Sequence, residues 1–106
     1  MTTTAPSKAD GASIELPERT SNRAEATKLV DDAIGETRVA VLTVDASQMV
    51  LSAPSFLDQL VKDVLITRRV PELVVVSATE RAGRLLTAAA IRRQVEALIR
   101  FENTRS

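Results

Sequence analysis

The chain of 106 residues contains no histidine, no cysteine, no tryptophan and no tyrosine. Without cysteine and histidine it cannot form disulfides, thiolate nucleophiles, imidazole bases or zinc sites built from these side chains. A Ser-His-Asp triad is excluded for the same reason. We therefore expect a protein that is not an enzyme and that has no metal site and no cofactor.

Glycine and aromatic residues are also scarce, with three glycines and two phenylalanines. Gly83 is the only glycine after Gly35, so the chain lacks a glycine-rich loop of the kind that holds phosphate groups. Phe56 and Phe101 are the only aromatic side chains, so the core must be aliphatic. Single-stranded nucleic acids are commonly bound by stacking on aromatic rings, which argues against such a ligand.

Neither charge sign dominates, since 14 basic residues balance 14 acidic ones. Residues 1–53 carry 5 basic and 8 acidic side chains, and residues 54–106 carry 9 and 6, an asymmetry too mild to indicate a nucleic-acid partner. No stretch approaches the roughly 18 apolar residues of a membrane-spanning helix, and the start MTTTAPSKADG has no hydrophobic signal core. We expect a cytoplasmic protein without a membrane contact.

The length and the 44% hydrophobic content predict one compact domain. Residues 1–11 are rich in Thr, Ala and Ser and are predicted to form a disordered tail. Residues 12–101 should form the domain, and residues 102–106 a C-terminal tail.

Strand and helix patterns alternate along the domain. Residues 12–16 (ASIEL) end at a proline and predict a short edge strand. Residues 22–34 predict an amphipathic helix, capped by Asn22 and ended by Gly35. Residues 38–45 (RVAVLTVD) show little alternation and predict a central strand covered on both faces.

The second half repeats this order. Apolar residues from Phe56 to Leu65 follow a helical rhythm that begins near Pro54, and residues 72–77 (ELVVVS) predict a second inner strand. A strand, a helix and a strand in succession imply a parallel crossover. The fold class is therefore α/β, with a small single-layer sheet of about four strands, partly parallel, packed with three to four helices.

The last segment, residues 80–101, carries two apolar stripes. One straight helix cannot bury both, because the stripes lie on roughly opposite faces at 100° per residue. Either the segment forms a kinked helix or two short helices, or one stripe is covered by a partner, or by a second copy in a homodimer. The stripes are Ala82, Leu85, Leu86 and Ala89, and Ile91, Val95, Leu98 and Ile99.

The stretch VDASQMVLSAPSF, residues 44–56, joins the central strand to the following helix. Asp45 can stabilise the turn or contact a partner. Ser52 can cap the helix, or it can be a regulatory site, because a phosphoryl group at a helix N-terminus is stabilised by the N–H groups there.

This stretch resembles the STAS-like subgroup of the domain family that includes the bacterial anti-sigma-factor antagonists. Asp45 matches a strand-end acid, residues 52–56 (SAPSF) match a serine-containing element, and Asp58 matches an acid in the helix. The segment SNRAEATKLVDDAI is also similar to the subgroup's first helix, and the resemblance covers residues 12–90. The chain departs from the antagonists' DSSG loop, since LSAPS has neither its Asp nor its Gly.

The resemblance implies a regulatory, non-catalytic domain that docks a protein partner, either an anti-sigma factor or another histidine-kinase-type ATPase. It implies phosphorylation of Ser52 or Ser55 as a switch. An alternative is a nucleic-acid-associated or homo-oligomeric structural module that uses the arginine-rich C-terminal helix. The residues expected to form the docking surface are Asp45, Ser47, Ser52, Ser55, Asp58 and Lys62.

Overall fold

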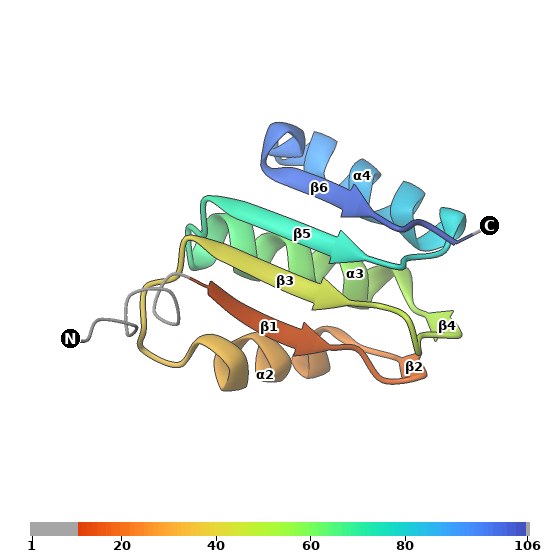
Figure 1. The fold of residues 1–106 in the computed structure, drawn as a ribbon, viewed down its shortest axis with the longest axis horizontal. Coiled ribbons are helices and arrows are strands. Elements are labelled where there is room, and N and C mark those ends of the chain that lie inside the picture. The colour runs from red at the N-terminus through yellow and green to blue at the C-terminus, as the bar shows by residue number, and fades with distance from the viewer. Residues whose placement is uncertain (1–10, 106) are drawn as a thin grey trace.

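The structure, a computed structural model, describes residues 11–105 and places four parallel strands in one sheet (Figure 1). The strand order is β1-β3-β5-β6, and each neighbouring pair is parallel, where we expected a partly parallel sheet. The α/β prediction is confirmed. The strands are β1 (Gly11–Glu15), β3 (Val41–Asp45), β5 (Glu72–Val76) and β6 (Ile99–Glu102).

Three α-helices connect successive strands of this sheet. They are α2 (Arg23–Ile34), α3 (Pro54–Val61) and α4 (Glu80–Arg92). Because the spatial order of the strands follows the chain and parallel crossovers are right-handed, all three helices lie on the same face, behind the strands in Figure 1. The result is two layers, one of strands and one of helices.

Helix α2 begins and ends where the sequence predicts. The Asn22 side chain accepts a hydrogen bond from the backbone N–H of Glu25 at 2.8 Å. Gly35 follows the last helical residue with a φ of +61°, which glycine adopts without the steric penalty that a Cβ atom brings. Both caps fix how the chain enters and leaves the helix.

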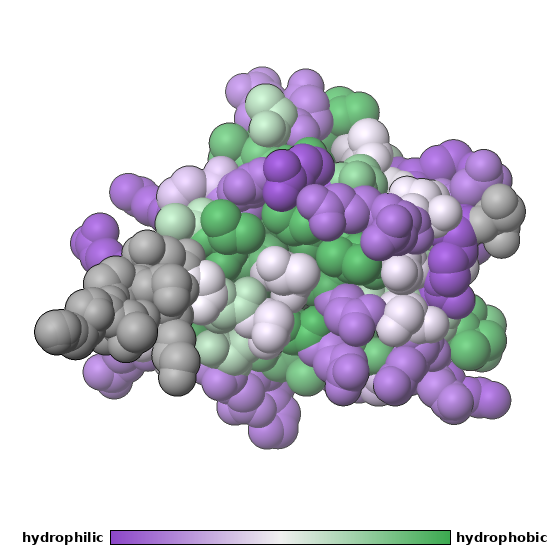
Figure 2. Space-filling model, viewed as in Figure 1, coloured by the Kyte–Doolittle hydropathy of each residue, from purple (hydrophilic) through white to green (hydrophobic). Residues whose placement is uncertain are grey.

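The core lies between the sheet and the helices. Leu42 and Val44 of β3 and Leu73 and Val75 of β5 are fully buried there. Thr43, next to them, points to the opposite face and is half-buried. The prediction that β3 is covered on both faces was therefore wrong, because half-buried residues alternate with its buried ones. No described helix covers the other face of the sheet, which is the face seen in Figure 2. Its central position is confirmed.

Helix α3 continues without interruption into η1 (Lys62–Thr67), a π-helical segment. The apolar rhythm predicted for this helix is confirmed, because Phe56, Leu60 and Val64 are fully buried. Helix α3 packs between α2 and α4, so it is the central helix of its layer.

The C-terminal segment breaks after one α-helix, as one of the two alternatives had it, but it ends in a strand rather than in a second long helix. Helix α4 ends at Arg92, Gln94 has a φ of +60°, and a short turn η2 (Glu96–Leu98) leads into β6. In β6, Ile99 and Phe101 alternate with charged residues, a period of two that pairs with β5 as a strand. The helical interpretation overlooked this short alternation.

The predicted tails, residues 1–11 and 102–106, can be compared with the structure only at residues 11 and 102–105. Of the predicted N-terminal tail only Gly11 is among the described residues, and it begins β1. At the other end, Glu102 belongs to β6, and the Arg105 N–H donates to the Ala78 carbonyl at 2.7 Å. The predicted C-terminal tail is thus part of the domain as far as Arg105.

A second, two-stranded sheet pairs β2 (Arg19–Thr20) with β4 (Leu51–Ser52), and the sequence did not predict it. It lies beyond the carboxyl ends of the main strands, at the right of Figure 1. Within residues 11–105 no helix has the length and apolar character that crossing a membrane requires.

Candidate functional site

The segment between β3 and α3 lies at the carboxyl end of the parallel sheet. In open α/β sheets, ligands commonly bind outside the carboxyl ends of the strands. The first turn of α3 adjoins it. We call the group the carboxyl-end surface; its residues are Asp45, Ser47, Val50, Leu51, Ser52, Pro54 and Ser55.

Asp45 closes the turn after β3. Its side chain accepts a hydrogen bond from the backbone N–H of Ser47 at 2.9 Å, the turn-stabilising role that was one of the two expected. Hydrogen bonds from Ser47, together with the positive charge of Arg105, hold the pKa of Asp45 below its ordinary value. Asp45 is therefore an anion at neutral pH, and Ser47 is exposed beside it.

Arg105 braces the turn from the far end of the sequence. Its guanidinium donates to the carbonyls of Ala46 at 2.8 Å and Met49 at 2.9 Å, and also to Ser77 at 2.6 Å. The side chains of Ala46 and Met49 are buried, so the turn is fixed on both sides. No sequence motif links Arg105 to a loop more than 50 residues earlier, and the sequence analysis missed it.

Val50 and Leu51 project from this braced turn into solvent. Their side chains are 72% and 56% exposed, while both backbone N–H groups donate to the Glu18 carbonyl, at 2.7 and 3.0 Å. Figure 2 shows apolar atoms protruding at the lower right, where Figure 1 places β4. Adjacent exposed aliphatic side chains on a fixed backbone are typical of an interaction site rather than of a mobile loop.

Ser52 does not cap helix α3, contrary to one of its two expected roles. The cap position is occupied by Ala53, which makes no side-chain cap bond, because Ser52 pairs with Thr20 as the last residue of β4. Arg81, in the first turn of α4, donates instead to the Ser52 carbonyl at 3.1 Å and to its hydroxyl at 3.4 Å. Pro54 occupies the first turn of α3 as predicted.

Asp58, which we expected on the docking surface, lies between the helices. Its side chain is 12% exposed and accepts hydrogen bonds from Arg23 of α2 at 2.9 Å, and from Arg92 and Arg93 at the end of α4 at 2.8 and 2.5 Å. Burial disfavours its charge, but the three arginines outweigh this and hold its pKa well below the usual range. Asp58 joins three helices and does not belong to the carboxyl-end surface.

Ser55 and Lys62 lie on the outer side of α3. Ser55 is half-buried in the first turn, and Lys62 is exposed where α3 passes into η1. Seven residues separate them, which is about 10 Å along a helix, so Lys62 stands at the margin of the carboxyl-end surface. The surface thus keeps Asp45, Ser47, Ser52 and Ser55 of the predicted set together and leaves Asp58 out. It adds Val50, Leu51 and Pro54.

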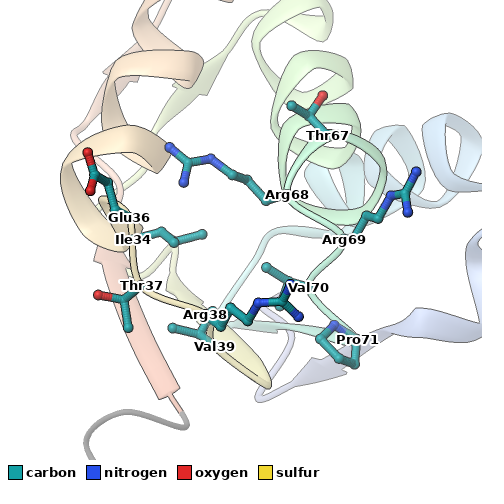
Figure 3. A pocket seen from close by; sticks show the side chains of 10 residues that line it. All are labelled: Ile34, Glu36, Thr37, Arg38, Val39, Thr67, Arg68, Arg69, Val70 and Pro71. Carbon is teal, nitrogen blue, oxygen red and sulfur yellow. The ribbon is translucent and has the colours of Figure 1, made fainter.

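A cavity of about 380 Å³ lies at the other end of the sheet, before β3 and β5 begin (Figure 3). Arg68 spans it and donates to the Gly35 carbonyl and to Asp31, at 2.6 Å for the latter. Arg69 points away from the cavity in Figure 3. These contacts stabilise the C-terminal end of α2, where carbonyl groups are otherwise unpaired.

No group of acidic side chains in the described part of the chain is arranged to hold a metal ion. Comparison with protein-family models, with curated proteins and with solved structures found no match to this chain.

Proposed function

We propose that the protein is a regulatory, non-catalytic domain of the STAS-like type, which docks a histidine-kinase-type ATPase domain through its carboxyl-end surface. The observation that carries the proposal is the pair of exposed aliphatic residues, Val50 and Leu51, next to Ser52 on a braced backbone. The similarity of residues 45–58 to the STAS-like element supports the choice of partner.

The two aliphatic side chains supply the affinity in this proposal. Burying a Val or Leu side chain contributes about 1.5–3 kcal/mol, so covering both contributes about 3 kcal/mol after allowance for their partial burial. The Arg105 brace and the Glu18 bonds order the backbone before a partner arrives, which reduces the entropy lost on binding. The carboxylate of Asp45 and the hydroxyl of Ser47 add polar contacts at the rim.

Phosphorylation of Ser52 supplies the switch. A phosphoryl group adds about −1.5 to −2 charge, and the guanidinium of Arg81 already lies 3.4 Å from the Ser52 hydroxyl. Arg81 would hold the phosphate beside Leu51 and place strong negative charge against the apolar part of the interface. Docking is then weakened. Ser55, in the first turn of α3, is the second candidate for this modification.

The nucleic-acid alternative receives no support from the arginines of α4. Arg92 and Arg93 both donate to Asp58, so two of the guanidinium groups that would contact phosphates are engaged within the domain.

Titration calorimetry against a panel of histidine-kinase-type ATPase domains tests the docking site. We expect one of them to bind, and Leu51→Asp to weaken binding by at least about tenfold because a carboxylate replaces a buried contact. Ile66→Asp is the matched control, because Ile66 is also exposed (41%) but lies at the far end of η1. Equal affinities of the two variants would refute the proposed surface.

Intact mass after incubation with ATP and the bound ATPase tests the switch. We expect the chain to gain one phosphoryl group, with Ser52→Ala losing this gain and Ser55→Ala keeping it. The reverse pattern would assign the switch to Ser55, and no gain with a partner that binds would refute phosphorylation while leaving the docking surface intact.

A further inference from the structure

We infer that two copies of this chain form a symmetric dimer by pairing their β6 strands antiparallel, so that two four-stranded sheets become one sheet of eight. This inference does not depend on the proposed docking function. It uses the opposite side of the domain from β1 and α2, where β6 is the last strand of the sheet.

The outer edge of β6 offers unpaired backbone groups. The Ser77 N–H donates to the Glu102 carbonyl at 2.8 Å, so the polar backbone groups of Glu102 are directed toward β5. These groups alternate along a strand, so the N–H and carbonyl of Phe101 are directed outward, and so is the carbonyl of Ile99, whereas the Ile99 N–H donates to the Glu96 carbonyl. An edge of this kind pairs readily with another strand.

In one antiparallel register, the charges on β6 are complementary to those on β6 of a second copy. If Phe101 pairs with Phe101 of the second copy, Arg100 lies opposite Glu102 of that copy, and Glu102 lies opposite its Arg100. These positions flank a hydrogen-bonded pair, where the facing Cα atoms approach to about 4.5 Å and opposite charges stabilise the pairing. Centring the pairing on Arg100 would instead place two arginines face to face.

The side chains of Arg100 and Glu102 are both accessible for ion pairs with a second copy. Arg100 contacts Glu72 at 3.5 Å and Glu102 at 3.3 Å, and its side chain is 59% exposed. Neither contact is buried, so Arg100 can exchange one exposed carboxylate for another at little cost. The other edge strand, β1, has the sequence GASIE, with Glu15 as its only charge, and lacks this self-complementarity.

An apolar groove of about 570 Å³ runs beside the same edge. Its floor includes Phe101, and α4 contributes Gly83, Thr87, Ala88 and Ile91 to its wall. Ile91 is 54% exposed, although it is a large aliphatic residue. The two-fold axis between the β6 strands places this groove against the same groove of the second copy. The dimer therefore covers Ile91, the most exposed residue of the second apolar stripe.

Sedimentation equilibrium of the full chain over a wide micromolar range tests the dimer. We expect a reversible transition from the 11.4 kDa monomer to twice that mass. Arg100→Glu alone and Glu102→Arg alone should each weaken self-association by at least about tenfold, because two attractive pairs become two repulsive ones. An equimolar mixture of these variants should restore the dimer, and so should Arg100→Glu/Glu102→Arg in one chain.

Circular dichroism melts of each variant verify that the folded state persists. Ile91→Asp should also weaken the dimer, while Ile66→Asp, with a similar change at a distant site, should not. A wild-type chain that stays monomeric throughout would overturn the inference. So would a dimer that survives both single charge reversals, or a mixture of the two variants that fails to associate.

Discussion

Replacing Asp58 by asparagine should lower the free energy of unfolding by about 3 kcal/mol. Asp58 accepts hydrogen bonds from three arginines on two other helices, and its side chain is 12% exposed. A hydrogen bond to a charged group contributes about 1.5–3 kcal/mol when buried. Arg93, at 24% exposure, should give a value in that range, whereas Arg23 and Arg92 are more than half exposed and should give about 0.5–1 kcal/mol each.

The same contacts predict how the difference in free energy of unfolding between the wild-type chain and Asp58→Asn depends on pH. The pKa of Asp58 is depressed in the folded state, while in the unfolded chain it should be about 3.9. The stabilisation is therefore fully present above about pH 5 and is lost progressively as the pH falls below about 4, where the unfolded chain takes up a proton first. The amide side chain of the Asp58→Asn variant does not titrate, so the difference between the two proteins should narrow on acidification.

Urea denaturation at pH 7 and at pH 3 measures both effects. Asp32→Asn is the matched control, because Asp32 pairs with Lys28 at 3.1 Å in an exposed contact and should change stability by less than about 0.5 kcal/mol. A loss below about 1 kcal/mol for Asp58→Asn at pH 7, or a difference that does not change with pH, would refute the assignment of Asp58 as the ion-pair centre of the helix layer.

Three further substitutions test separate features of the fold by the same denaturation assay. Gly35→Ala should cost about 1 kcal/mol, because Gly35 has a φ of +61°, and a neutral result would contradict the strain argument. Thr20→Val should be neutral or stabilising, since the buried Thr20 hydroxyl has no hydrogen-bond partner among the described residues, and a loss above about 1 kcal/mol would reveal a missed partner. Arg105→Ala should cost about 2 kcal/mol and speed amide exchange at Met49, whereas unchanged exchange would contradict the brace.

The elements that the sequence predicted well are those whose signals are local. Asn22 and Gly35 bound helix α2 through contacts or conformations confined to a few neighbouring residues. The aliphatic run at 72–76 correctly predicted an inner strand, because this signal is local as well. Such patterns depend on periodicity and capping, which a single sequence displays directly.

The features that were missed depend on residues far apart in the chain. Asp58 matched a family element, but its burial results from arginines that stand about 35 residues away on either side. Serine commonly caps helices, yet Ser52 pairs with Thr20 in β4. It therefore lies one residue before the cap position of α3. In β6, only four residues alternate, too few to outweigh the helical spacing that precedes them. In each case a contact with a residue far away in the chain decided the structure.

The measurement that tests the docking surface most directly is an amide nuclear magnetic resonance titration of the ¹⁵N-labelled chain with the ATPase domain that binds it. The account predicts that shift changes and line broadening concentrate at residues 45–55 and the first turn of α4, which carries Arg81. Changes centred on β6 and the groove of α4, or a bound ATPase domain that leaves the signals of residues 45–55 unchanged, would contradict it.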